Sequence, residues 1–273
     1  MSQAPEIELV RAPNPGPLTG AGTNTWIYGN DETLVIDPGP ADEAHLARVL
    51  QVATRRGPVV MVACTHHHID HLEGAARFCE LSGAPLAVHF RRANGTNTLA
   101  LHDGDRLLVG RNELVAVHTP GHAADHVCFF DEATRVLFTG DHVLQGTTSL
   151  VVPPDGDMKF YLESLDRVLQ LEPQRLYPGH GEPIEAAAIA IRELIAHRLE
   201  RQAQILRQLQ HGASTPEALV EALYASYPAE VLGMAAGTVL AHLLKLEGEG
   251  RVWQVADEPP HRFALVPATA SPD

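Results

Sequence analysis

The sequence is poor in cysteine and in cationic residues, and each shortage argues against a class of protein. Its 273 residues include three cysteines, which are widely spaced and lie in apolar segments. This usage is typical of reduced core residues and disfavours a disulfide framework or a thiolate metal site. Lysine and arginine number 20 against 34 aspartates and glutamates, for a net charge of −14. The acidic balance disfavours a long nucleic acid as partner, because phosphate binding usually needs a basic stripe.

Long hydrophobic runs are also missing. No apolar stretch reaches the length of a membrane span, and the first ten residues, MSQAPEIELV, lack the basic start and apolar core of a signal peptide. We therefore expect a cytoplasmic protein without a membrane partner. Hydrophobic residues make up 45% of the chain, as in ordinary globular proteins, and the length suits a large domain with or without a small one.

Residues 1–193 predict a layered α/β domain, in which strands and helices alternate around buried sheet. The periodicity and the glycine or proline breaks predict strands at 23–29, 32–39, 58–65 and 175–180, helices at 41–56, 70–83 and 158–171, and five short strands between residues 85 and 140. The first two strands flank GND, which indicates a hairpin. The run PVVMVACT is apolar throughout and predicts a strand buried on both faces.

Residues 194–273 predict a small second domain. A long helix ends at Gly212, two further helices are expected at 214–227 and 229–250, and 251–257 with 261–266 suggest a two-strand ribbon. Three helices and a ribbon form a winged-helix pattern, and we expect the end at 268–273 to be frayed.

Winged helices often bind nucleic acid, but this one has few cations for that purpose. It contains six lysines and arginines against nine aspartates and glutamates, and its third helix offers only His242 and Lys245. Duplex DNA is therefore a disfavoured partner, and a module that packs against the first domain or covers its substrate is the preferred interpretation.

Histidine, by contrast, is concentrated in the stretch THHHIDHLEG at 65–74. This stretch follows a buried strand and leads into a helix, and open α/β sheets bind ligands at such strand ends. Alternate side chains of extended backbone point the same way, so His66 and His68 can converge on one metal while His67 faces elsewhere. Asp70 and His71, at the start of the helix, can reach a second metal beside the first.

A zinc site usually has three or four protein ligands, so we expect further ligands at the ends of other strands, distant in sequence from residues 66–71. Three short motifs supply candidates, each after an apolar run and beside a glycine. HTPGH contains His122, FTGDH contains Asp141, and LYPGHG contains His180. Glycine at these places lets the backbone approach a metal closely.

The motifs H-x-H-x-D-H at 66–71, TPGH at 119–122, TGD at 139–141 and PGHG at 178–181 resemble those of the metallo-β-lactamase superfamily in order and spacing. The resemblance implies an αββα four-layer sandwich with a dinuclear centre at one edge. It also implies the ligands, with one ion held by His66, His68 and His122, the other by Asp70, His71 and His180, and both bridged by Asp141.

Longer segments resemble one branch of this superfamily, that of β-lactamase-like protein 2. They are NPGPLTGAGTNTWIYG, GDHVLQGTTSLVVPPDGDMKFYLESL and HRLERQAQIL, so the resemblance covers nearly the whole chain. The branch includes a single-strand-selective endoribonuclease and fungal thioesterases acting on carrier-bound polyketides, so the substrate is left open.

Two cations that share one water lower its pKa and produce a bridging hydroxide nucleophile. This chemistry predicts a metal-dependent hydrolase in which Asp70 is also a candidate proton acceptor. Two zinc ions suit the imidazole and carboxylate donors best, and manganese or iron is compatible with them. Histidine at position 68 favours hydrolysis over the redox chemistry of di-iron relatives. Asp37 either orients a ligand or starts a turn, and His142, beside the bridging aspartate, is a candidate for touching substrate.

Three functions remain open on the sequence. The preferred one is hydrolysis of an ester or thioester of a small or carrier-bound acyl substrate. The second is endonucleolytic cleavage of single-stranded RNA, and the third is a non-enzymatic, metal-dependent regulator that binds nucleic acid. The sequence indicates no oligomeric state.

Overall fold

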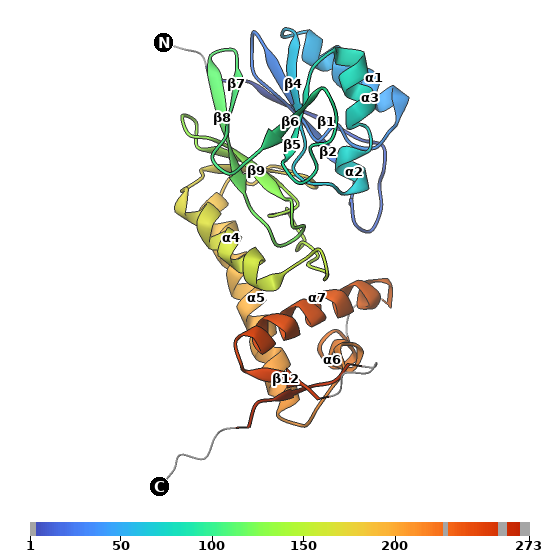
Figure 1. The fold of residues 1–273 in the computed structure, drawn as a ribbon, viewed down its shortest axis with the longest axis vertical. Coiled ribbons are helices and arrows are strands. Elements are labelled where there is room, and N and C mark those ends of the chain that lie inside the picture. The colour runs from blue at the N-terminus through green and yellow to red at the C-terminus, as the bar shows by residue number, and fades with distance from the viewer. Residues whose placement is uncertain (1–3, 226–228, 256–260, 268–273) are drawn as a thin grey trace.

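The computed structural model describes residues 4–225, 229–255 and 261–267, and Figure 1 shows how its elements are arranged. Two sheets form the centre of the large domain. The first consists of β1 (Ile7–Arg11), β2 (Asn24–Tyr28), β3 (Thr33–Ile36), β4 (Val59–Ala63), β5 (Leu86–His89) and β6 (Thr98–Leu101), hydrogen-bonded in that order. The second has the order β11 (Arg175–Pro178), β10 (Val136–Gly140), β9 (Val127–Asp131), β8 (Asn112–His118) and β7 (Arg106–Val109).

Strand direction determines which chain ends meet at one edge. The predicted hairpin is present as the antiparallel pair β2 and β3, and β3 to β6 then run parallel. In the second sheet β10 and β11 are parallel, while the other neighbours are antiparallel. The segments that follow β4, β10 and β11 carry the predicted metal ligands.

Alternating side chains divide each sheet between two apolar layers. Trp26 and Tyr28 point between the sheets, where they pack with Phe129 of the second sheet. Ile27 points outward, against α1 (Glu43–Thr54) and α3 (Ala75–Ser82), and Phe130 packs on the other outer face against α4 (Met158–Gln170) and α5 (Ala187–Leu209). The four-layer αββα sandwich is therefore confirmed.

The helix predicted over 70–83 is instead two helices, α2 (Ile69–Leu72) and α3. The break lies at Gly74, whose amide donates to the Gly39 carbonyl at 2.9 Å rather than continuing the helical ladder. A Cβ at Gly74 would lie only 2.8 Å from the Pro40 carbonyl oxygen, so this approach needs glycine. The predicted end at Gly83 is confirmed, with a left-handed φ of 75°. The short strand β6, half exposed and weakly patterned, was not predicted.

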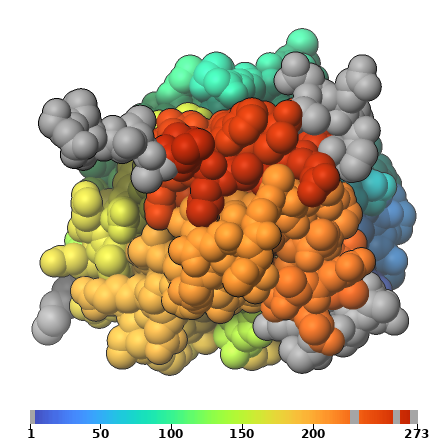
Figure 2. Space-filling model, turned by 90° about the horizontal axis from the view of Figure 1, so that it is seen from below, coloured from blue at the N-terminus to red at the C-terminus, as the bar shows by residue number. Residues whose placement is uncertain are grey.

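The second unit contains α6 (Pro216–Leu223), α7 (Ala229–Gly248), β12 (Val252–Gln254) and β13 (Phe263–Leu265), as the winged-helix pattern predicted. Thr215 caps α6, its Oγ1 accepting from the Ala218 amide at 3.2 Å. Seen from this end, α5, α6 and α7 form one continuous face (Figure 2). The predicted ends of the second helix at 226–227 and of the ribbon at 256–257, and the tail at 268–273, lie outside the described residues.

Helix α5 joins the two units. Its first half packs through Ile191 into the core beside the second sheet, whereas Ile205 packs into the core of the C-terminal unit. The predicted boundary between residues 193 and 194 falls within this helix and stays a prediction. None of the described helices combines the length and the apolar character that crossing a membrane requires.

Candidate metal centre

The predicted ligands come together at one edge of the two sheets. Three of the segments that carry them follow strand ends: 66–71 follows β4, Asp141 follows β10 and His180 follows β11. His122 comes from the loop between β8 and β9. The loops are tied to each other by the backbone, because the Val127 amide donates to the Thr65 carbonyl at 2.7 Å and the Gly179 amide donates to the Gly140 carbonyl at 2.8 Å.

Three imidazoles form the first group. His66 Nε2 and His122 Nε2 each lie 2.9 Å from His68 Nδ1. Burial holds the pKa of His66 well below its usual value, and it lowers the pKa of His68 to about 4, with neighbouring histidines adding to both shifts. The two rings are therefore neutral near pH 7, so lone pairs converge where these nitrogens meet.

Two imidazoles and a carboxylate form the second group. Asp70 Oδ2 lies 3.2 Å from His180 Nε2 and 3.4 Å from His71 Nε2. Burial opposes the charge on each ring, but Asp141 and neighbouring carboxylates outweigh it, so the pKa of His71 is raised well above its usual value and that of His180 to about 9. In the absence of a metal, protons on these rings balance the carboxylate charge.

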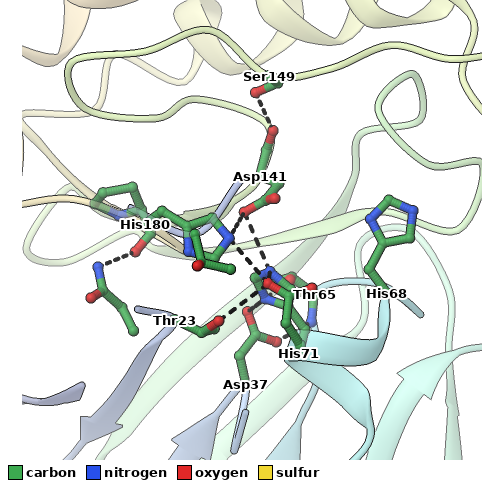
Figure 3. A network of polar contacts seen from close by, with 12 residues as sticks. Thr23, Asp37, Thr65, His68, His71, Asp141, Ser149 and His180 are labelled. Atoms are coloured by element: carbon green, nitrogen blue, oxygen red, sulfur yellow. Dashed lines mark hydrogen bonds and ion pairs between the residues drawn. The ribbon is translucent and has the colours of Figure 1, made fainter. Parts of the chain in front are cut away.

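Asp141 lies between the two groups. Its Oδ1 is 3.4 Å from both His71 Nε2 and His180 Nε2, and its Oδ2 is 3.8 Å from His122 Nε2 (Figure 3). Burial alone would raise the pKa of this carboxyl, yet the two histidines of the second group hold it well below its usual value. One carboxylate thus turns an oxygen toward each group, which is the placement that the predicted bridging role requires.

Other side chains orient the candidate ligands. Asp37, at a left-handed φ of 51°, accepts hydrogen bonds from the Thr65 amide and hydroxyl, and its Oδ2 lies 2.9 Å from His71 Nδ1. This contact directs the other ring nitrogen of His71 into the cluster. His122 is held likewise, with its Nδ1 2.6 Å from the Leu150 carbonyl oxygen. Of the two interpretations of Asp37, the structure supports the one in which it orients a ligand.

The donor set fits metal cations. His71 Nε2 and Asp141 Oδ1 are buried and face each other as an ion pair at 3.4 Å, but neither makes a hydrogen bond of normal geometry among the described residues. Buried polar atoms without partners are rare in proteins and cost free energy unless something else satisfies them. Imidazole nitrogens and carboxylate oxygens in groups of three, all within 4.8 Å of one another, are donors that zinc, manganese and iron accept.

Two neighbouring residues differ from expectation or were not anticipated. His142 is fully buried against Tyr161 and does not line the cavity in front of the cluster, so it is not placed to touch substrate. Asp155, in the loop before α4, lies 3.8 Å from both His67 Nε2 and His68 Nε2 and does line that cavity. Its segment has no periodicity or metal spacing, so no sequence signal distinguished it.

The cluster opens into a cavity of about 680 Å³. Asp70, Asp141 and His180 line its inner end, together with His68 and His122. Its walls are formed by the loop at 144–155 and by residues of α5 and α7, including Met234. The C-terminal unit therefore covers the site, as the preferred interpretation of this domain proposed. Meanwhile His242 is buried and Lys245 is bonded to Gln202 and Glu249.

An αββα sandwich with a histidine and aspartate cluster at its edge defines the class of metallohydrolases with this fold. Residues 18–95 and 96–180 match the family described as Metallo-beta-lactamase superfamily, and residues 215–259 match the Beta-lactamase associated winged helix domain. The chain belongs to the metallo-beta-lactamase superfamily and is a hydrolase of that superfamily, whose members typically bind metal ions.

Relatives of the chain include homologues of β-lactamase-like protein 2 and carrier-protein thioesterases. The chain is 34% identical over 273 residues to a Beta-lactamase-like protein 2 homolog of Drosophila melanogaster, covering 90% of this chain and 89% of the relative. It is 32% identical over 248 residues to an Atrochrysone carboxyl ACP thioesterase of Aspergillus fumigatus, covering 84% and 76%. A metallo-beta-lactamase family protein from Thermus thermophilus superposes with a TM-score of 0.79 at 26% identity, covering 95% of this chain and 98% of the other.

Proposed function

We propose that the chain uses two divalent cations, preferably zinc, to hydrolyse an ester or thioester of a small or carrier-bound acyl substrate. The observation that carries the proposal is the combination, in one cavity, of the Asp141 cluster with apolar walls. Leu144, Leu150, Val152 and Met234 line that cavity and suit an acyl chain. The relative named as an acyl carrier thioesterase supports the same substrate class.

The cluster residues divide into two proposed metal sites. His66, His68 and His122 would hold one cation, and Asp70, His71 and His180 the other, with Asp141 between them. Bound there, two cations supply a water of lowered pKa and polarise the carbonyl group under attack. In the net reaction the carbonyl carbon gains an oxygen from water, its bond to sulfur or oxygen breaks, and the thiol or alcohol leaves with a proton.

Asp70 is the proposed acceptor of the proton that the attacking water gives up, which then passes to the leaving thiol or alcohol. Its side chain is more exposed than that of Asp141, at 23% against 12%, so it faces the cavity. Burial raises the pKa of Asp70, but His180 and His71 outweigh that effect and bring it down to about 2. The carboxylate is therefore ionised at neutral pH, and Thr23 Oγ1 orients it by donating to Oδ2 at 3.1 Å.

The nucleic-acid alternatives receive less support. The net charge of −14 opposes phosphate binding. In the described part of α7, the two possible cations are internal, since His242 is buried and Lys245 contacts Gln202 and Glu249. We also propose a cytoplasmic location, which suits three unpaired cysteines.

The test compares purified protein loaded separately with zinc, manganese or iron, and an Asp141→Ala variant, on three substrates. They are an acyl thioester, bis(p-nitrophenyl) phosphate and a labelled single-stranded RNA. We expect metal-dependent thioester cleavage that the variant loses, with a metal content of two per chain by elemental analysis. Turnover of RNA without thioester cleavage would replace the proposed substrate, and binding of duplex DNA without any turnover would favour the regulator.

A further inference from the structure

Helix α5 buries two arginines beside the cavity. Arg198 and Arg201 lie one turn apart and are 3% and 8% exposed. Burying a charge is costly unless it is paired, so the guanidinium groups of buried arginines normally contact carboxylates. Arg56 follows that rule elsewhere in the chain: its side chain is 15% exposed, and its Nη2 lies 2.7 Å from Glu8 Oε2.

Among the described residues, neither Arg198 nor Arg201 has such a partner. Arg198 donates through Nη2 to the Ser149 carbonyl, and Arg201 donates through Nη1 to the Leu223 carbonyl at 3.4 Å. The Arg201 guanidinium also stacks on Tyr224, 4.0 Å from the ring centroid. Within the described part of the chain, no carboxylate oxygen lies within 4.0 Å of either group, and both Nε atoms are without hydrogen-bond partners.

The positive charge of the two arginines adds to the effect of burial on nearby histidines. Burial lowers the pKa of His242 to about 3, and Arg198, Lys245 and Arg201 contribute further to the shift. Burial likewise lowers the pKa of His197, with Arg198 and Arg201 acting in the same direction. A carboxylate beside the two guanidinium groups would oppose the part of these pKa shifts that the arginines cause.

Both arginines line the same cavity as the metal cluster. Ser149 links Arg198 to the metal cluster: its hydroxyl donates to the Asp141 carbonyl (Figure 3), and its carbonyl accepts from Arg198. A molecule that fills the cavity therefore reaches Asp141 at one part of its length and the guanidinium groups at another.

We infer that Arg198 and Arg201 form an anion-binding subsite that selects substrates carrying an oxyanion away from the bond to be cleaved. The inference rests on the proposed hydrolysis of acyl substrates. Planar guanidinium groups bind carboxylate or phosphate oxygens through paired hydrogen bonds. The oxyanion is either a carboxylate on the acyl chain or the phosphate of a phosphopantetheine arm. On a chain with a net charge of −14, such a substrate needs a local positive site.

The first measurement is direct binding of two probes, glutarate and 4′-phosphopantetheine, to metal-loaded protein by calorimetry. Arg201→Gln removes one guanidinium without touching the Ser149 contact, and Arg201→Lys keeps the charge while removing the planar fork. Arg207→Gln is the control on the same helix, because Arg207 is exposed and paired with Glu200. We expect at least one probe to bind about tenfold more weakly to Arg201→Gln than to the control, the loss expected for a charged hydrogen bond.

The second measurement is selectivity in hydrolysis. Glutaryl and pentanoyl thioesters differ in one carboxylate, and each is made on N-acetylcysteamine and on 4′-phosphopantetheine. For every variant we measure kcat/KM for each substrate and compare the ratio between the substrate that carries the extra negative charge and the one that lacks it. A ratio of glutaryl to pentanoyl that falls about tenfold in Arg201→Gln identifies the acyl carboxylate as the ligand. A similar fall in the ratio between the two thiol arms identifies the phosphate.

The outcomes separate the subsite from the hydrolase. If thioesters are cleaved and neither ratio nor either probe affinity changes in the Arg201 variants, the subsite is refuted while the proposed function stands. If no thioester is cleaved, the proposed function fails, and the calorimetry alone decides on the subsite. A loss of single-stranded RNA binding in Arg201→Gln with unchanged probe binding would overturn the inference. Should Arg201→Gln not fold, Arg201→Lys tests the planar fork alone, and unchanged probe affinity and ratios in that variant would count against the paired hydrogen bonds.

Discussion

The substitution Gly179→Ala tests how closely the loop after β11 approaches the metal cluster. A Cβ built at Gly179 would lie 2.5 Å from Asp141 Oδ1 and 2.7 Å from His71 Cε1. Ordinary contact starts near 3.4 Å, so the carboxylate would have to retreat by roughly 0.9 Å and the ring by roughly 0.7 Å. The ring has little freedom because Asp37 holds its other side.

These displacements set the expected size of the effect. A misplacement of about 1 Å at a catalytic centre costs about a hundredfold in rate. We therefore expect Gly179→Ala to fold, to bind metal more weakly and to lose about two orders of magnitude in kcat/KM for its best thioester. Metal affinity is measured by competition with a chromophoric chelator, and folding by near-ultraviolet circular dichroism.

Gly233→Ala is the matched control, since it makes the same chemical change on the exposed face of α7. An added Cβ there meets nothing within 4 Å. We expect it to leave metal binding unaltered and to stabilise the chain by about 0.5–1 kcal/mol, the helical advantage of alanine over glycine. Wild-type metal affinity and turnover in Gly179→Ala would refute the close approach and, with it, the placement of Asp141 beside His71.

Two further predictions address orientation and pH. Asp37→Ala should weaken metal binding about 10- to 100-fold, because His71 loses the contact that orients it. Asp42→Ala is the control, since it should only remove the cap of α1 and lower the free energy of unfolding by about 1 kcal/mol. Equal metal affinity of the two variants in chelator competition would contradict the orienting role of Asp37. The pKa of His242 is lowered to about 3 in the folded protein, so the unfolded chain binds a proton more readily below pH 6.5. The free energy of unfolding is therefore unaffected by this residue's titration above pH 6.5 and decreases as the pH falls toward 3. Between pH 7 and 5, urea unfolding should show a fall in stability about 2 kcal/mol larger in the wild type than in His242→Leu, and parallel pH profiles would exclude this residue as the cause.

The C-terminal unit contributes residues to the wall of the cavity in front of the metal cluster, which is a role other than nucleic-acid binding. Helix α7 packs closely on the loop before α4, where a Cβ at Gly237 would lie 2.8 Å from Val152 Cγ1. Met234 and Thr238 of the same helix line the cavity. Under the proposed function, the acyl substrate would lie between the two domains, and the winged helix would cover it.

Much of the fold was predictable because its signals are local. The apolar run at 58–65 and the hairpin around GND have patterns that few other structures share, and both are confirmed as β4 and as β2 with β3. The helix break at Gly74 was missed, because its cause is a hydrogen bond to Gly39, far away along the chain. Strand β6 was missed because a short, half-exposed edge strand has almost no periodicity.

For the candidate site, too, some features could be predicted from the sequence and others depended on the tertiary structure. The sequence by itself predicted the candidate donors, because their residue types, their order and their glycine-flanked motifs can be read along the chain and resemble those of the superfamily. Only the tertiary structure decided that Asp141 turns one oxygen toward each group, that Asp155 joins the cavity, and that Arg198 and Arg201 contact no carboxylate of the described residues. The reason is physical: what a side chain can bind is a property of its own atoms, whereas which atoms surround it depends on segments that only folding brings together.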